Sequence, residues 1–141
     1  MTEKLDALIE VCNAQTMDGE TEKIEMSVVG TICETDEGFL VEYTEYDEDA
    51  RSCRTTVRAV GDSLVSVMRE GDFGGEMLFE AGKRNSTAYS TPYGELMMGV
   101  YTERVENELT KDGGRLHFRY TTDFHAQAAI ENRMTLTVTL K

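Results

Sequence analysis

Residues 134–140 read Met134-Thr-Leu-Thr-Val-Thr-Leu140, with an apolar residue at every second position and a threonine between each pair. Successive side chains of a β-strand point to opposite faces, so this period of two predicts a strand with one buried face and one face of threonines. The same alternation runs through residues 24–33, 39–44 and 116–121, and more weakly through 53–60, 64–69, 76–81 and 95–105. The chain is therefore predicted to be all-β.

Turn signals separate these runs at short intervals, among them Asp18-Gly19, Glu37-Gly38 and Gly61-Asp62. Short strands at regular spacing are typical of a sandwich or a barrel, and about 8–10 antiparallel strands fit this length as a closed barrel without edges. Residues 5–12 fit both a helical stripe and a strand face, but the turn at Asp18-Gly19 and the clear strand after it favour a hairpin. No domain boundary stands out, so we expect one barrel domain over residues 1–141.

The charge of the chain is strongly acidic. It has 14 Lys and Arg against 27 Asp and Glu, a net charge of −13. Phosphate binding needs clustered basic residues, so the charge argues against a nucleic-acid partner and against an anionic membrane surface. The charge is typical of a soluble protein, or of one with a basic partner.

The start of the chain and its cysteines indicate a compartment. Glu3, Lys4 and Asp6 interrupt any apolar stretch that could serve as a signal peptide, and no run is long enough to span a membrane. The three cysteines, Cys12, Cys33 and Cys53, are odd in number and widely spaced. We therefore expect reduced thiols and a cytoplasmic protein.

Several pieces of the sequence, in this order, resemble one known family. They are Gly30, Phe39-Leu-Val-Glu-Tyr-Thr-Glu-Tyr46, Val67-Met-Arg-Glu-Gly71, Leu78-Phe79, Tyr89-Ser-Thr-Pro-Tyr-Gly94 and the ending Met134-Thr-Leu-Thr-Val138. The chain resembles the YwiB-like family, a bacterial family of unknown function, over nearly its whole length. The resemblance implies an isolated β-barrel of calycin, or lipocalin-like, type with a central cavity. It implies no activity, because one fold serves many functions.

Four residues are the candidates for binding a ligand in such a barrel: Tyr43, Arg69, Tyr89 and Tyr93. Arg69 ends an apolar run just before Gly71, where it could anchor an anionic group or close the barrel as a structural residue. Thr91-Pro92-Tyr93-Gly94 has the composition of a turn, which would bring Tyr89 and Tyr93 to the barrel mouth. Met26, Met68, Met77, Met98 and Met134 fall at positions expected to face inward, where methionine suits either a ligand cavity or a filled core.

Other chemistry has little support. His117, on the expected outer face of its strand, and His125 form no metal-binding spacing, and no phosphate loop or nucleophile elbow is present. We expect no metal, no cofactor and no catalytic residue. Residues 34–49 contain eight acids and no Lys or Arg, which indicates a solvated acidic face, with Arg54 and Arg58 able to pair with Glu42 across the strands.

Three functions follow from these observations. The first is a binding protein that holds a small, mostly apolar molecule inside the barrel. The second is a protein-interaction or regulatory module that uses the acidic surface around residues 34–49 and has a packed, inert core. The third, an enzyme acting on a small ester or peroxide inside the cup, has no motif behind it.

Overall fold

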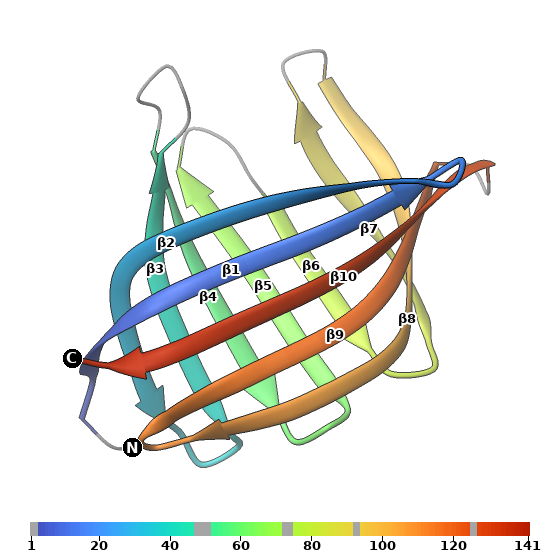
Figure 1. Cartoon of the computed structure of the whole chain (residues 1–141). Helices are drawn as coiled ribbons and strands as arrows, with labels where there is room; N and C mark the ends of the chain where they lie inside the picture. Colours follow the sequence, from blue (N-terminus) through green and yellow to red (C-terminus); the bar gives the residue numbers. More distant parts are fainter. Residues whose placement is uncertain (1–2, 47–51, 72–74, 92–93, 125–126) are drawn as a thin grey trace.

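The computed structural model describes residues 3–46, 52–71, 75–91, 94–124 and 127–141 (Figure 1). Its ten strands are β1 (Leu5–Met17), β2 (Glu20–Glu34), β3 (Phe39–Tyr46), β4 (Ser52–Val60), β5 (Leu64–Gly71), β6 (Gly75–Glu80), β7 (Arg84–Thr91), β8 (Gly94–Thr110), β9 (Gly113–Phe124) and β10 (Gln127–Leu140). The all-β prediction is confirmed, and so is the strand at the start of the chain. No helix with the length and apolar character of a membrane span occurs in these ranges.

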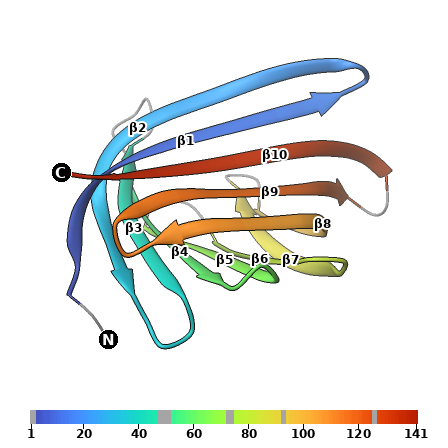
Figure 2. The same ribbon diagram turned by 60° about the horizontal axis from the view of Figure 1, so that its bottom comes forward.

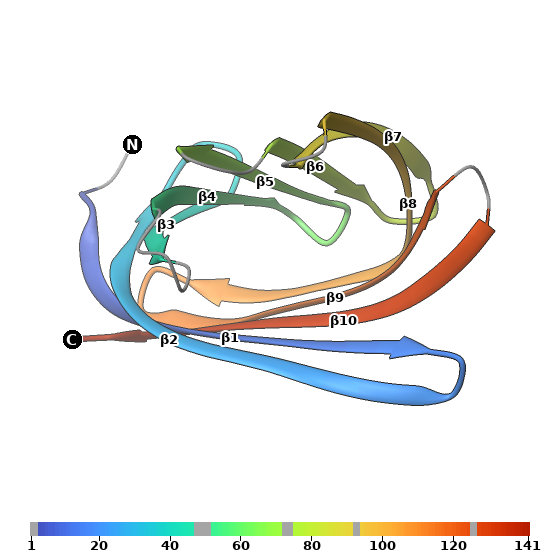
Figure 3. The same ribbon diagram turned by 90° about the horizontal axis from the view of Figure 1, so that it is seen from above.

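All ten strands belong to one antiparallel sheet, with the order β6-β5-β4-β3-β2-β1-β10-β9-β8-β7. Every neighbouring pair except β1 and β10 is joined by a hairpin connection, and β1 pairs with β10 from Ala7 opposite Leu140 to Thr16 opposite Glu131. The sheet curls until its two end strands, β6 and β7, come side by side. Seen from above, β3 to β7 form one wall and β8, β9, β10, β1 and β2 form the other (Figure 3). The result is a nearly closed barrel.

The inward positions of the strands build the core. They alternate with exposed positions, as in β4, where Cys53, Thr55, Val57 and Ala59 are buried. The largest fully buried side chains include Phe79, Ile9, Ile32 and Leu116. The period of two in the sequence thus becomes one continuous apolar interior, and the burial of such residues is the main force that stabilises the fold.

At one end of the barrel, polar contacts join β8 to the turn between β4 and β5. We call this the lower end; it carries the turn between β4 and β5 (Figures 1 and 2). Asn107 of β8 donates from its backbone N to Oδ1 of Asp62 (3.1 Å) and from Nδ2 to the carbonyl of Gly61 (3.0 Å). These bonds fasten β8 to the β4–β5 turn across the barrel.

The seam between β6 and β7 is closed in an unusual way. The two strands follow each other around a tight turn, in which the N–H of Lys83 donates to the carbonyl of Glu80 (3.0 Å). Continued regularly, that hairpin would have the backbone N–H groups of Asn85 and Thr87 donate to the carbonyls of Leu78 and Glu76. In the described parts of β6 and β7 no backbone ladder forms. Instead, the side chain of Asn85 donates from Nδ2 to Leu78 (3.4 Å) and that of Thr87 from Oγ1 to Glu76.

At Asn85 and Thr87, two alternate positions of β7, the side chain therefore makes the hydrogen bond that the backbone N–H of the same residue would make in a regular hairpin. The strands are held apart by the length of these side chains. A hollow of about 230 Å³, which Glu76, Leu78, Asn85, Ser86, Thr87 and Val100 line, marks the seam on the surface.

Candidate functional site

Two of the four predicted ligand-binding residues lie in one row on the inner wall. Tyr43 of β3 is directly opposite Thr55 of β4, and Thr55 is directly opposite Arg69 of β5. Tyr43 and Thr55 are buried, and the Arg69 side chain is 23% exposed. The row lies toward the upper end of the barrel, where β3 and β5 finish (Figure 1).

Glu45 joins this row and holds Arg69. Nε of Arg69 donates to Oε2 of Glu45 (3.2 Å), and Oγ1 of Thr55 donates to the same oxygen (2.6 Å). Sequence reasoning missed this role and assigned Glu45 to a solvated acidic face. The inward direction of Glu45 was visible in the sequence, because Val41, Tyr43 and Glu45 share one face of an alternating strand. The pair favours the structural interpretation of Arg69, since its guanidinium already neutralises an inward carboxylate.

Burial changes the acidity of two groups beside this pair. It raises the pKa of the Tyr43 hydroxyl far above its ordinary value, and the nearby charge of Glu45 raises it further. The pKa of the Cys53 thiol is raised by the same two causes in the same order. Both groups are therefore protonated at neutral pH, so neither adds a negative charge beside Glu45.

A cavity of about 30 Å³ opens beneath the row. Its lining is apolar and aromatic apart from Arg69, and consists of Val11, Tyr43, Val57, Val67, Arg69, Met77, Phe79, Phe118, Tyr120, Met134 and Leu136. Three rings fill the centre, with the Phe79 centroid 4.8 Å from that of Phe118 and 4.5 Å from that of Tyr120. Because one water needs roughly 10–15 Å³, the cavity has room for about two water molecules as it stands.

The other two predicted residues cannot be placed beside the row. Tyr89 belongs to β7, where its backbone is opposite Leu96, but its side chain lies outside the described part of the structure. Tyr93 lies outside the described residues altogether. Thr91 and Gly94, which flank it, are paired across the strands. A mouth lined by these two tyrosines stays a prediction.

The methionines divide between the two faces. Met77 and Met98 are buried, and Met26 and Met134 pack against the core from partly buried positions. Met68 was expected to face inward and does not, since it lies between the inward residues Val67 and Arg69. The run Leu64-Val-Ser-Val-Met68 carries apolar residues on both faces, so its alternation did not identify the inner one.

The acidic run at residues 34–49 does not form one face. Glu42 points outward and is paired with Lys4 (2.9 Å) and with Arg54, as expected for Arg54; the Lys4 hydrogen bond is the main cause that lowers the pKa of Glu42. Glu45 points inward. Glu34, Asp36 and Glu37 are exposed around the connection between β2 and β3 at the lower end, and residues 47–49 lie outside the described residues.

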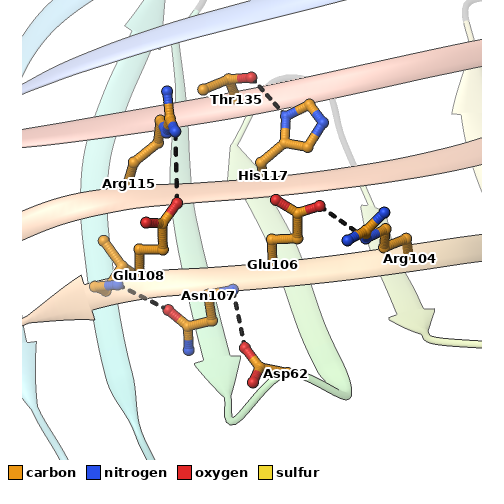
Figure 4. A network of polar contacts seen from close by, with 9 residues as sticks. Asp62, Arg104, Glu106, Asn107, Glu108, Arg115, His117 and Thr135 are labelled. Atoms are coloured by element: carbon orange, nitrogen blue, oxygen red, sulfur yellow. Dashed lines mark hydrogen bonds and ion pairs between the residues drawn. The ribbon is translucent and has the colours of Figure 1, made fainter.

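The outer face of β8 to β10 carries small polar contacts (Figure 4). His117 lies there, as predicted, and its Nδ1 is 2.8 Å from Oγ1 of Thr135. Arg104 pairs with Glu106 at 2.7 Å, and Arg115 with Glu108 at 3.5 Å. His125 lies outside the described residues, and within the described ranges no three His, Cys, Asp or Glu side chains gather as metal ligands would. All three cysteines have free thiols.

Comparison with known proteins agrees with this architecture. Residues 9–136 match the family described as "Domain of unknown function (DUF1934)". The chain is 27% identical over 122 residues to "Uncharacterized beta-barrel protein YwiB" of Bacillus subtilis (strain 168), which covers 86% of this chain and 83% of that protein. The crystal structure of the B. subtilis ywiB protein superposes with a TM-score of 0.89 at 22% identity, and covers 100% of this chain and 95% of the other.

Proposed function

The chain belongs to the DUF1934 family of β-barrel proteins, and we propose that it is a cytoplasmic, calycin-type barrel that binds a small, mostly apolar molecule at its upper end. The observation that carries this proposal is the lined cavity beneath the row of Tyr43, Thr55 and Arg69. Apolar walls with a few polar groups at one end are typical of small-molecule sites.

The size of the cavity sets the conditions for binding. Drug-sized ligands occupy pockets of roughly 300–1,000 Å³, so an occupant of this barrel has to be small and has to displace side chains. Met77 and Met134 lie in the lining, and methionine has three rotatable bonds and no branch, which lets it repack around a guest. Tyr43 and Arg69 line the cavity toward the upper end, which we propose as the route of entry.

The ion pair restricts the chemistry of the ligand. A free carboxylate would have to compete with Glu45 for Arg69, and would bring a second negative charge beside it. A neutral molecule that accepts a hydrogen bond suits this site better. Arg69, Tyr43 and the predicted tyrosines Tyr89 and Tyr93 are the residues we propose for its polar end.

Native mass spectrometry tests the proposal on protein purified gently from its own host. A bound mass that disappears on denaturation supports a ligand and gives its chemical class. A second measurement uses the fluorescent apolar probe N-phenyl-1-naphthylamine with paired variants. Met134→Ala, which enlarges the cavity, should increase probe binding, and Val67→Phe, which fills it, should abolish binding. Val29→Phe on the exposed surface is the control.

A clean mass without adduct, together with probe binding that ignores both cavity variants, contradicts the proposal. That result would favour the second candidate, an interaction module that binds a basic partner. Glu34, Asp36 and Glu37 support this alternative, because they lie exposed at the lower end, where Glu3 and Asp112, together with Lys111, line the same surface hollow as Glu34. Its test is charge reversal at Asp36 and Glu37, because Glu45 is engaged with Arg69.

A further inference from the structure

Most of β2 has only one neighbouring strand. On one side β2 pairs with β1 over most of its length, from Glu20 opposite Met17 to Ile32 opposite Leu5. On its other side it pairs with β3 only from Thr31 to Glu34. Within the described residues, the segment 20–30 therefore has an unpaired edge, which we call the free edge of β2. Figures 1 and 3 show β1 and β2 extending together beyond β3.

Gly30 marks the point where β2 leaves β3. A Cβ placed on Gly30 would lie 2.2 Å from the carbonyl oxygen of Glu42 and 3.0 Å from the Cβ of Tyr43. Only glycine allows the two backbones to approach this closely. Beyond this contact β2 bends away from β3, and its outer N–H and C=O groups face no strand in the described structure.

The free edge is long and carries exposed apolar side chains. Ile24 is 56% exposed and Val29 is 54% exposed. Long, exposed edge strands with such residues are templates for pairing with another chain, and natural proteins protect them with charged side chains (especially lysine), proline, bulges or inward charges. The segment Glu20-Thr-Glu-Lys-Ile-Glu-Met-Ser-Val-Val-Gly30 contains no proline, and its only basic residue is Lys23.

We propose that the occupant of this edge is a second copy of the same chain, paired antiparallel with Ile24 opposite Ile24 of the copy. In this register the numbers of two facing residues, one from each copy, always add up to 48. Lys23 then lies opposite Glu25 of the copy, and Glu25 opposite Lys23 of the copy. Opposite charges in direct cross-strand pairs stabilise a sheet, and like charges destabilise it.

Neighbouring registers lack this complementarity. A shift that gives a sum of 46 places Lys23 opposite Lys23, and a sum of 50 places Glu25 opposite Glu25. A sum of 47 places Glu22 opposite Glu25 twice, and a sum of 49 leaves Lys23 without an acidic residue opposite. The sequence of the edge is thus self-complementary at one central register, as the interface of a two-fold dimer requires.

The same register brings Ile24 of the two copies together, while Met26 lies opposite Glu22 and Val28 opposite Glu20. Ile24, Met26 and Val28 continue the inward face of β2, on which Met26 and Val28 pack against the core. An even sum keeps the inward faces of both copies on one side, so Ile24 would meet its own counterpart at the two-fold axis. Residues 20–28 of each copy would pair, and the sheet would continue from one barrel into the other.

Sedimentation of the full chain with charge-swap variants tests the proposal. We expect a dimer at about 100 µM, a concentration at which even a weak homodimer forms. Lys23→Glu and Glu25→Lys should each weaken the dimer about tenfold, because each places two like-charge pairs at the interface. The double variant Lys23→Glu/Glu25→Lys should restore dimerisation, because it exchanges the two charges. A chain that is monomeric at this concentration overturns the proposal, and so does a dimer that none of these variants affects.

Cross-linking tests the register independently of affinity. In a Cys12→Ser background, Ile24→Cys would lie opposite its counterpart, within the Cα separation of roughly 4.4–6.8 Å that a disulfide needs. Mild oxidation should convert this variant into a covalent dimer. The control is Val29→Cys, which is equally exposed but would lie about 34 Å from its counterpart, ten residues along the paired strand. Equal cross-linking of both variants, or of neither, contradicts the register.

Discussion

Nε of Arg69 lies 3.2 Å from Oε2 of Glu45, although β4 runs between the two strands that carry them. Thr55 of β4 donates to the same carboxylate oxygen, so three neighbouring strands are tied together at one inward-facing group. This arrangement keeps a carboxylate at the edge of an apolar interior, and its energetic weight can be measured.

Removing one partner should cost more than removing both. Arg69→Met leaves Glu45 charged and without its main partner, and we expect a loss of about 1–3 kcal/mol in the free energy of unfolding. The double variant Arg69→Met/Glu45→Gln should recover much of this loss. Urea denaturation of the single and double variants measures it. The control is Arg54→Ala, whose exposed pair with Glu42 should contribute less than about 1 kcal/mol. Simple additivity of the two substitutions would show that the pair is not coupled.

Stability should decrease in alkali because of Tyr43. Burial raises the pKa of its hydroxyl above the ordinary 10.0, so the folded state holds this proton more tightly than the unfolded state does. The contribution is fully present below pH 10 and is lost as the pH rises further, by up to about 1.4 kcal/mol per pH unit. Urea denaturation between pH 8 and pH 11 should show a shallower decline for Tyr43→Phe than for the wild type.

Tyr101→Phe is the matched control for this titration, since Tyr101 is 42% exposed. The free energy of unfolding of this variant should decline with pH as steeply as that of the wild type. The pKa of Cys53 is also raised by burial, so Cys53 adds to the loss of stability above pH 9.0. This addition is the same in the wild type, Tyr43→Phe and Tyr101→Phe. Identical slopes for Tyr43→Phe and Tyr101→Phe would exclude Tyr43 as the titrating group.

The seam between β6 and β7 should depend on two side chains. Asn85→Ala and Thr87→Val each remove a donor to a β6 carbonyl, and each should cost about 1 kcal/mol. Hydrogen exchange of residues 75–80 and 84–88 should become faster, while that of β1 and β10 stays unchanged. Thr139→Val on the exposed face of β10 is the control and should have no effect. Unchanged exchange in both seam variants would mean that packing alone closes the barrel.

The aromatic cluster should dominate the stability of the core. Phe79→Ala removes a ring that is 2% exposed and contacts both Phe118 and Tyr120, and it should cost about 3–5 kcal/mol. Leu78→Ala, at the preceding position and on the other face, should cost about 1 kcal/mol. Thermal and urea denaturation compare the two variants. Equal losses would show that the interior is loosely packed around these rings.

Alternation predicted the strands well because each has one buried face. It placed Tyr43 on the apolar face of its strand, whereas Arg69 was proposed because it ends an apolar run just before Gly71. It could not reveal Glu45 as the partner of Arg69, because that contact depends on the register of three strands, which hairpin signals alone do not fix. Met68 was misplaced for a related reason, since the run before Arg69 is apolar on both faces.

Two features of the whole sheet could not be predicted from the sequence. The barrel was expected to have no edges. Among the described residues, however, β2 has an unpaired edge over residues 20–30 and the seam has no backbone ladder. Neither follows from local propensity. The first depends on the close approach at Gly30, and the second on side chains of Asn85 and Thr87 that occupy the gap between two strands.

The seam falls between strands that are consecutive in sequence, while the two ends of the chain lie on neighbouring strands within the sheet. The backbone N–H of Lys141 donates to the carbonyl of Asp6 (3.2 Å). A circular permutant that joins the present termini through a short linker and begins at Lys83 would therefore run β7-β8-β9-β10-β1-β2-β3-β4-β5-β6. Each strand of that chain would pair with the one before it. The barrel therefore has the topology of a simple meander, except that its chain termini lie in the middle of the sheet and not at its two end strands.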